Sequence, residues 1–444
     1  MKPFLVQPAS AILGRLILPG DKSIASRAVI LSSLVTGSTL VENFPSNQDC
    51  LYTVGAFRKL GVQIKSCLKT KNRYLEIFGR GLGALKKPEL PLFVGDSGTT
   101  LRLLLGVLTG CDFRIKIITA KSLAKRPMLR VTAPLRMMGA NIACRRLASQ
   151  KEEYPPIVIQ GNSSPRAINY KMTVASAQVK SAILLAGLKA KGITKITEPL
   201  ATRDHTERML KFFKADIKTK GKAIFIKGDK ELHSPGKIYL PADISSASFF
   251  MVLAAILPRS KIVIKKVSLN TSRLGIVRAL RGMGANITII SRSFKAAGLE
   301  PLGDIKIGSS NLKAIRITKK DIPSLIDELP ILMVAACFAK GKSVFEGIEE
   351  LRVKETDRIN SMCCNLKRMG ADIKVQGNKA KEIIVIRGLR GLKGCSLKSF
   401  GDHRTAMSIV VAALAASGKS LLDDVSCINK SFPEFLPILK GLLR

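Results

Sequence analysis

A pattern that recurs six times along the 444 residues constrains the fold more than any other feature of the sequence. Each copy has a small or polar start, an apolar helix of about three turns, a Gly or polar break, a short β-branched strand and an acidic or polar turn. The copies span 23–43, 97–119, 176–198, 245–266, 327–346 and 402–424. Their spacing of roughly 75 residues is longer than a solenoid repeat and shorter than a domain.

A second helix alternates with the first and ends at a Gly or polar residue before another β-branched strand. This pattern covers 59–64, 137–142, 212–217, 282–287 and 368–373. A Gly at a helix C-terminus followed by a strand is typical of αβ turns. The sequence therefore predicts an α/β protein of six repeated units, grouped as two lobes of three.

Two Pro-containing segments mark where the chain is expected to pass between the lobes, at 18–20 and 240–242. One predicted lobe comprises residues 21–241. The other is discontinuous and comprises residues 1–20 together with residues 242–444.

The net charge is high: 73 Lys and Arg stand against 32 Asp and Glu, a formal charge of +41. A basic surface can bind a nucleic-acid backbone. The basic residues are scattered, however, Trp is absent, and no RNA-binding aromatic pattern, zinc finger or basic-zipper region is present. The charge favours a generally basic surface with a site for small anions, although composition alone does not decide.

Other features exclude several classes of protein. Nine cysteines without a C-x-x-C pair indicate reduced thiols in the cytoplasm, and none of the three His has metal-site spacing to a Cys. No apolar run reaches the ~18–20 residues of a membrane helix, and we expect a soluble chain without a targeting signal. Nucleotide-binding P-loops, dinucleotide fingerprints and the hydrolase G-x-S-x-G motif are absent.

Polar and charged residues gather where the six apolar helices begin. Helix N-termini bind anions through unsatisfied N–H groups and a partial positive charge, and added Lys and Arg strengthen this binding. We expect these ends to converge on one cleft for a small, multiply anionic ligand. The residues concerned are Asp21, Lys22, Ser23, Arg27, 95–100, Arg102, 176–178, 243–246, Asp327, Glu328 and 402–404.

Simpler interpretations exist for some of these residues. Ser, Thr and Asp are common helix caps, and capping is the favoured interpretation for Ser245 and Ser246. In the segment 352–358, Lys354 and Arg358 are four residues apart and share a face if the segment is helical. A solvated salt-bridge face is an equally good interpretation of that segment.

In order along the chain, nine segments resemble those of the 5-enolpyruvylshikimate-3-phosphate (EPSP) synthase family. Each segment is short, but nine in the family's order are highly specific. They are LPGDKSIASR at 18–27, GDSGTTLR at 95–102, KRPM at 125–128, SAQVKSA at 176–182, RDHTE at 203–207, DELP at 327–330, RVKETDR at 352–358, GDHRTAM at 401–407 and NKSFP at 429–433.

The resemblance implies two lobes, each built from three βαβαββ units in an inside-out barrel. It also implies transfer of the enolpyruvyl group of phosphoenolpyruvate to the 5-hydroxyl of shikimate 3-phosphate, with release of phosphate, in the shikimate pathway to aromatic amino acids. No cofactor or metal is implied, and no membrane or specific nucleic-acid partner. A cytoplasmic monomer is expected, and the herbicide glyphosate is a phosphoenolpyruvate competitor in this family.

The resemblance also assigns site residues by motif position. Shikimate 3-phosphate is expected to contact Lys22, Ser23, Arg27, Ser176, Ala177, Gln178, Asp327 and Lys354. Phosphoenolpyruvate is expected to contact Lys22, Gly98, Arg126, Gln178, Arg358, Arg404 and Lys430.

The reaction needs an acid and a base on opposite sides of one bond, because a poorly nucleophilic C=C is protonated while a hydroxyl loses its proton. The resemblance assigns Asp327 to the 5-hydroxyl and leaves Glu355 and Lys22 as candidates for proton transfer at the methylene carbon. How these roles divide among the three catalytic residues stays open.

The sequence departs from the family pattern in three places. Ala177 replaces a common Ser, Asp96 replaces an Asn, and Glu350-Leu351 replace a Tyr-Asn pair.

Two alternative functions also stay open. A sister enzyme that uses UDP-N-acetylglucosamine typically has Asn after the first-helix Lys and a catalytic loop Cys, whereas here Ser23 follows Lys22 and no Cys lies near Arg126. The second alternative is an RNA-binding protein or RNA-terminal-phosphate cyclase, for which the high positive net charge would be suitable.

Overall fold

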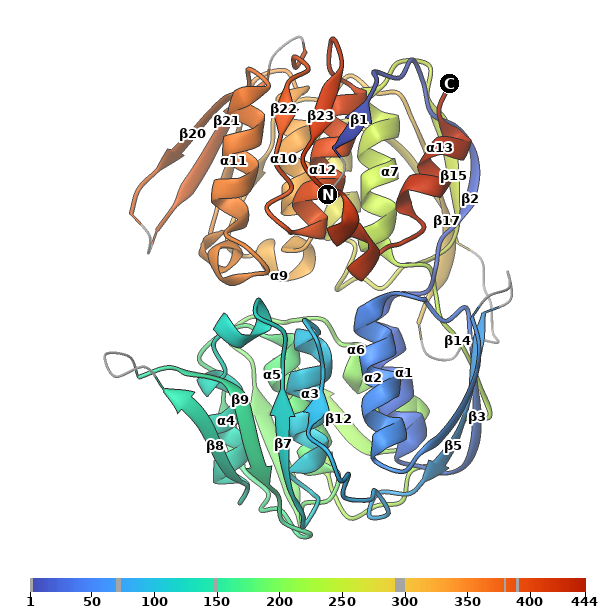
Figure 1. Ribbon diagram of the computed structural model, residues 1–444, viewed down its shortest axis with the longest axis vertical. Helices are drawn as coiled ribbons and strands as arrows, with labels where there is room; N and C mark the ends of the chain where they lie inside the picture. Colours follow the sequence, from blue (N-terminus) through green and yellow to red (C-terminus); the bar gives the residue numbers. More distant parts are fainter. Residues whose placement is uncertain (1–2, 69–72, 147–150, 292–299, 379–380, 389–390) are drawn as a thin grey trace. The chain divides into compact units, whose positions relative to one another are not determined.

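The computed structural model describes residues 3–68, 73–146, 151–291, 300–378, 381–388 and 391–444 (Figure 1). The chain divides into two compact units. One comprises Gly20–Leu240 together with a short segment that ends at Glu300. The other comprises Met1–Pro19, Pro241–Lys295 and Pro301–Arg444. We call them the Gly20–Leu240 unit and the C-terminal unit.

The Gly20–Leu240 unit contains three repeats, each with one four-stranded sheet. The first consists of β14 (Lys237–Tyr239), α1 (Lys22–Ser33), β3 (Thr36–Glu42), α2 (Gln48–Lys59), β4 (Gln63–Cys67) and β5 (Tyr74–Arg80). The second consists of β6 (Leu92–Phe93), α3 (Gly98–Leu108), β7 (Arg114–Ile118), a 3-10 helix η1 (Leu123–Lys125), α4 (Leu129–Met137), β8 (Asn141–Arg146) and β9 (Glu153–Gln160). The third consists of β10 (Asn169–Lys171), α5 (Ala177–Gly187), β11 (Ile193–Thr197), α6 (His205–Phe212), β12 (Asp216–Lys220) and β13 (Ala223–Lys227).

The C-terminal unit repeats the plan three times. Its first repeat consists of β2 (Leu13–Ile17), α7 (Ile244–Ile256), β15 (Lys261–Ser268), α8 (Gly275–Gly282), β16 (Asn286–Ser291) and β17 (Leu302–Gly308). The next consists of β18 (Arg316–Ile317), α9 (Ile322–Leu325), α10 (Leu329–Cys337), β19 (Lys342–Glu346), η3 (Glu349–Val353), α11 (Arg358–Arg368), β20 (Asp372–Gln376) and β21 (Ile383–Arg387). The last consists of β22 (Ser396–Leu397), α12 (His403–Leu414), β23 (Ser420–Leu422), η4 (Ser426–Lys430), α13 (Phe435–Leu442) and β1 (Phe4–Val6).

All six sheets share one pattern of strand pairing. The first two strands of a repeat are parallel, as in β6 with β7 and β18 with β19, because a helix connects them. The last strand then pairs antiparallel with the second, as in β9 with β7 and β21 with β19. In the five four-stranded sheets the third strand lies at the sheet edge, and the last sheet, of order β1-β23-β22, has no corresponding strand among the described residues. The predicted α/β fold of repeated βαβαββ units is confirmed.

The first strand of one repeat in each unit comes from a distant part of the chain. β14 pairs parallel with β3, and β2 pairs parallel with β15. The chain consequently leaves each unit beside the point where it enters. In the Gly20–Leu240 unit, a Cβ on Gly20 would lie 2.4 Å from the Asn43 carbonyl oxygen and 2.7 Å from the Leu240 Cβ. Only glycine fits at that position.

One buried helix of each repeat forms the core of its unit: it is the first helix in every repeat except the one with α9 and α10, where it is α10. In the Gly20–Leu240 unit α3 packs against α1 and α5, and in the C-terminal unit α12 packs against α7 and α10. All twelve residues of α12 are buried, and α10 is buried along its whole length. A helix that is apolar on every side must be enclosed in this way. The outer helices bury only one face.

The second helices end in a shared backbone conformation. After α2, α4, α8 and α11 a glycine takes a positive φ, at Gly61, Gly139, Gly284 and Gly370. After α6 the same position is occupied by Lys214, with φ +63°. The hydrogen bonds are the same in all five places, for example Gly61 N–H to the Arg58 carbonyl and Lys214 N–H to the Lys211 carbonyl. Lys214 is thus the non-glycine residue among these five positions of positive φ.

Candidate functional site

Helix caps organise the polar residues of the Gly20–Leu240 unit. The Asp21 carboxylate accepts hydrogen bonds from the backbone N–H of Ser23 and Ile24, at 2.8 and 3.0 Å. Ser97 caps α3 and Ser176 caps α5 through their hydroxyls. These caps fix the starts of α1, α3 and α5, and they leave the following side chains to act on a ligand.

Arg27 lies one turn into α1 and is almost completely buried, with 4% of its surface exposed. Its guanidinium donates to the hydroxyls of Thr206 at 2.6 Å and Ser181 at 2.9 Å, and to the Ser23 carbonyl at 2.9 Å. Burial lowers the pKa of Arg27 to about 10, and the charges of Glu207 and Asp21 oppose this effect only in part. A buried cation whose direct partners are neutral oxygens favours a nearby anion.

A second group of side chains gathers around the start of α3. Arg102 Nη1 donates to Gln178 Oε1 at 2.7 Å, and Gln178 Nε2 donates to the Thr99 hydroxyl at 2.9 Å. A Cβ on Gly98 would lie 2.7 Å from Arg102 Nη1 and 3.3 Å from Arg126 Nη1. The structure therefore brings Gly98, Arg126 and Gln178 together around Arg102.

The loop that carries Arg126 is held by carboxylates. Asp96, one of the departures from the family pattern, accepts a hydrogen bond from the Leu123 N–H at the start of η1. Glu152 accepts from the N–H groups of Met128 and Leu129, at 3.2 and 2.8 Å. Asp96 thus has a structural partner next to the cations, which explains how a carboxylate is accommodated there.

Glu153 supports the same loop and gives a pH prediction. Its carboxylate is fully buried, and burial alone would raise its pKa. Hydrogen bonds from Thr132, Arg146 and Arg136 outweigh burial and lower the pKa to about 2. Because this value is below the ~4.3 of an unfolded Glu, the stabilisation is present above that pH and is lost as the pH falls towards 2.

We therefore expect Glu153→Gln to reduce the difference in urea midpoint between pH 7 and pH 3, with most of the loss at pH 7. The exposed Glu89→Gln variant is the control and should leave both midpoints unchanged. An unaltered pH dependence in Glu153→Gln would show that this carboxylate does not contribute to acid sensitivity.

The remaining predicted residues of this unit lie at the same helix starts. Lys22 Nζ forms an ion pair with Asp49 Oδ2 at 2.8 Å, and a fifth of the lysine side chain is exposed. The Asp49 carbonyl also accepts from Thr100 in α3, which links the starts of α2 and α3. Ala177 is the first residue of α5, directly after its cap Ser176. We call Lys22, Ser23, Arg27, Gly98, Arg102, Arg126, Ser176, Ala177 and Gln178 the Arg27 cluster.

Arg358 is the centre of the second cluster, in the C-terminal unit, and is 1% exposed. Its guanidinium contacts Glu355 at 2.5 Å, Asp402 at 2.9 Å and Asp327 at 3.7 Å. Burial opposes the charged form, but these three carboxylates outweigh it and raise the pKa of Arg358. A solvated salt-bridge face, the alternative for this segment, is excluded for Arg358.

Asp327 lies between two guanidinium groups. Arg404 Nε is 3.8 Å from Asp327 Oδ1, and Arg404 Nη1 donates to the Asp327 carbonyl at 2.8 Å. Asp402 caps α12 through the N–H groups of Arg404 and Thr405. We call Asp327, Lys354, Glu355, Arg358, Asp402 and Arg404 the Arg358 cluster.

Lys354 belongs to the Arg358 cluster but not through a helix face. The segment that follows η3 is irregular, Asp357 caps α11, and Arg358 is the first residue of that helix. Lys354 and Arg358 would share a face only if the segment were helical, and that condition is not met. Lys354 instead approaches Glu350 at 3.6 Å. Burial lowers the pKa of Lys354, and Glu350 and Asp327 oppose this effect.

Helix α7 is capped by Asp243, not by Ser245 or Ser246. Ser245 donates to the buried Glu328 instead. Capping by the two serines is therefore wrong. Lys430 is the last residue of η4, which packs against α12, and its side chain is exposed.

Some residues that shape the clusters were not assigned a role from the sequence. Ser181 and Thr206 hold Arg27, and Arg352 joins Glu382 through two hydrogen bonds while it also pairs with Asp357. Ser181 and Thr206 lie within two of the nine segments that resemble the EPSP synthase family, and this position was the signal that could have identified them. Glu382 lies 30 residues from Arg352, and no local pattern connects them.

No group of three or more His, Cys, Asp or Glu among the described residues could hold a metal ion. All nine cysteines are free, and burial raises the pKa of Cys111 to about 11, in keeping with an inert thiol. Within the part of the chain that the structure describes, no helix has both the length and the apolar character needed to cross a membrane.

Comparison with solved structures first identifies the fold. The enolpyruvyl transferase NikO from Streptomyces tendae has the same fold, with a TM-score of 0.77 over 100% of this chain and 98% of its own, at 16% identity. At that identity the likeness concerns the fold alone. This chain therefore shares the repeated fold of that transferase.

Sequence comparison then identifies the family. The family model for EPSP synthase (3-phosphoshikimate 1-carboxyvinyltransferase) matches residues 6–439. The 3-phosphoshikimate 1-carboxyvinyltransferase of Desulforamulus reducens is 44% identical over 99% of both chains. The EPSP synthase structure from Acinetobacter baumannii is 40% identical, with a TM-score of 0.85 over 100% of this chain and 98% of that one. The chain belongs to the EPSP synthase family.

Proposed function

We propose that the chain transfers the enolpyruvyl group of phosphoenolpyruvate to the 5-hydroxyl of shikimate 3-phosphate, with release of phosphate, and that its two clusters carry out this reaction. Membership of the EPSP synthase family is the observation that carries the proposal. Both substrates are anions. The concentration of buried or partly buried cations at helix starts in each unit supports binding of this kind.

In the Arg27 cluster, Lys22 pairs with Asp49, whereas Arg27 and Arg102 donate hydrogen bonds to neutral groups. Arg27 is fixed by two hydroxyls, and Arg102 by the amide of Gln178. We assign Lys22, Ser23, Arg27, Ser176, Ala177 and Gln178 to shikimate 3-phosphate, together with Lys354 and Asp327 of the C-terminal unit. Gly98, Arg126, Gln178 and Lys22 are assigned to phosphoenolpyruvate. Ala177 has no side-chain donor, so it can donate a hydrogen bond only through its main-chain N–H.

The Arg358 cluster supplies both cations and proton-transfer groups. Arg358, Arg404 and Lys430 are assigned to phosphoenolpyruvate, so the developing charge of the departing phosphate is stabilised by guanidinium groups. Asp327 is the base for the 5-hydroxyl. Its position beside Arg358 and Arg404 holds the carboxylate in place while it accepts the proton. Glu355 and Lys22 are the candidates for protonation of the methylene carbon.

The proposed function is tested by phosphate release from phosphoenolpyruvate with different acceptors. We expect release with shikimate 3-phosphate and none with UDP-N-acetylglucosamine. Release with the second acceptor alone would assign the chain to the sister reaction. Tight, strongly salt-dependent RNA binding without any phosphate release would refute the transferase assignment.

Gly98→Ala tests the phosphoenolpyruvate assignment. The added methyl group would press on the guanidinium groups of Arg102 and Arg126. Glyphosate has one more atom between its carboxylate and its phosphorus than phosphoenolpyruvate has, so a smaller site excludes the inhibitor more strongly. We expect the Ki of glyphosate to rise by about 10- to 100-fold and the KM of phosphoenolpyruvate by less.

Gly55→Ala is the matched control, because a Cβ at Gly55 would meet no atom within 4 Å. It should change neither constant. An equal loss of inhibitor and substrate binding in Gly98→Ala would contradict the placement of phosphoenolpyruvate at Gly98.

We also propose that the protein acts as a monomer in the cytoplasm. Nine free cysteines, five of them buried, support a reducing compartment. Sedimentation velocity tests the oligomeric state, and a concentration-dependent increase in mass would contradict the monomer.

A further inference from the structure

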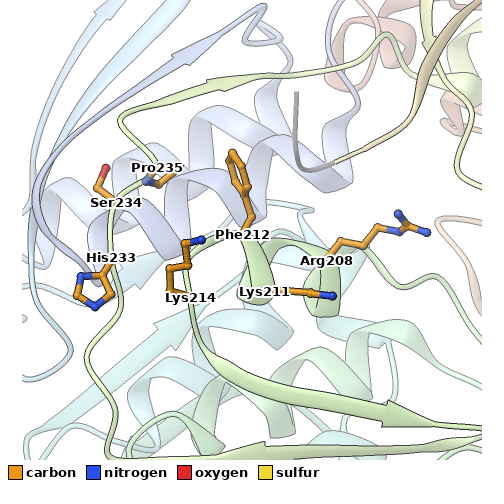
Figure 2. Close-up of a pocket in the computed structure, with 7 residues that line it drawn as sticks. All are labelled: Arg208, Lys211, Phe212, Lys214, His233, Ser234 and Pro235. Carbon is orange, nitrogen blue, oxygen red and sulfur yellow. The ribbon is translucent and has the colours of Figure 1, made fainter. Parts of the chain in front are cut away.

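A cavity of ≈ 540 Å³ lies at the C-terminal end of α6, in the Gly20–Leu240 unit. Figure 2 shows its seven lining residues, four from α6 and the turn that follows it and three from the segment 233–235. None of the residues assigned to either substrate lines it. Its volume is within the range of about 300–1,000 Å³ that is typical of small-molecule sites.

The lining is basic on one part and apolar on another. Arg208, Lys211, Lys214 and His233 line the cavity, and none of its seven lining residues is acidic. Arg208 pairs with Asp204 at 2.7 Å. Among the residues that the structure describes, neither Lys211 nor Lys214 forms an ion pair, so two positive charges face the cavity without a carboxylate. Phe212 and Pro235 provide the apolar part.

The backbone of Lys214 also distinguishes this turn from the corresponding turns of the other repeats. A non-glycine residue at φ +63° is strained, and the four corresponding turns in other repeats have glycine. A glycine would satisfy the same hydrogen bonds without strain. Favourable interaction of lysines with the last carbonyls of a helix explains Lys211, but it does not explain a lysine at the left-handed position.

The walls of the cavity are held firmly. The Ser234 hydroxyl donates to the Ser38 carbonyl at 2.7 Å and accepts from the Gly236 N–H at 3.0 Å. The His233 N–H donates to the Phe213 carbonyl at 3.0 Å, which joins the segment 233–235 to the end of α6. A site that is fixed before binding loses less entropy when a ligand arrives.

We propose that this cavity is a second anion site, which binds a small organic phosphate with a planar or apolar portion. The phosphate contacts Lys211 and Lys214, and the apolar portion lies against Phe212 and Pro235. An inorganic anion alone would leave most of the cavity and its apolar wall unused.

The experiment measures binding of adenosine monophosphate, adenosine and inorganic phosphate by calorimetry, with shikimate 3-phosphate present at saturation to occupy the substrate site. We expect the monophosphate to bind more tightly than either of its parts. Lys211→Gln and Lys214→Gly should each weaken its binding at least about tenfold. Lys218→Gln, an exposed change on β12 outside the cavity, should not.

Lys214→Gly also separates binding from folding. Because glycine relieves the strained φ, its melting temperature should be no lower than that of the unchanged protein. Lys214→Asn, which also tolerates this conformation, serves as the second variant if Lys214→Gly is unstable. Absence of monophosphate binding, or equal binding by all variants, would overturn the proposal. Binding of inorganic phosphate as tight as that of the monophosphate would overturn the organic-ligand assignment.

Discussion

Asp327→Asn is expected to lower kcat by about two to four orders of magnitude while shikimate 3-phosphate still binds. The amide has nearly the same shape as the carboxylate and can still accept hydrogen bonds, but it cannot accept the proton of the 5-hydroxyl. Asp327 contacts two guanidinium groups at 3.7 and 3.8 Å, distances at which the loss of its charge disturbs the cluster only moderately. The variant should therefore fold.

The measurement is steady-state phosphate release together with calorimetric binding of shikimate 3-phosphate. Asp372→Asn, on the partly exposed edge strand β20 of the same unit, is the matched control and should retain full activity. Near-normal turnover in Asp327→Asn would refute its role as the base. Loss of binding together with turnover would assign Asp327 to substrate binding instead.

The sequence predicted the fold because the fold is periodic. Helices such as α10 and α12 are buried along their whole length, and glycines such as Gly341 and Gly418 follow them before a strand. Such local signals repeat with the fold. They also located the helix starts, and hence the Arg27 cluster, because Lys22, Gly98 and Gln178 lie within a turn of a cap.

Contacts between distant residues could not be predicted in the same way. The segment 352–358 has helical spacing, yet Arg352 pairs with Glu382 and Asp357 caps α11, so the chain at Lys354 is not helical. Thr206 is 179 residues from its partner Arg27. Hydrogen bonds of this kind depend on the packing of one repeat against another, and no period in the sequence records them.

Arg358→Met is expected to cost the C-terminal unit about 3–5 kcal/mol of stability. Arg358 is 1% exposed, its partner Asp402 is 0% exposed, and Asp327 and Glu355 are also in contact with it. Methionine fills much of the volume but leaves the Asp402 charge buried without its guanidinium partner. For a unit of this size we expect the melting temperature to fall by about 10 °C, as measured by calorimetry.

Asp402→Asn in the same background separates charge from packing. Asparagine caps a helix nearly as well as aspartate, so the double variant keeps the start of α12 while it removes the buried charge. If the stability loss comes from the uncompensated carboxylate, Arg358→Met/Asp402→Asn should be more stable than Arg358→Met and recover a large part of the lost melting temperature. Additive losses would instead show that Arg358 stabilises the unit through packing and through its contacts with Asp327 and Glu355.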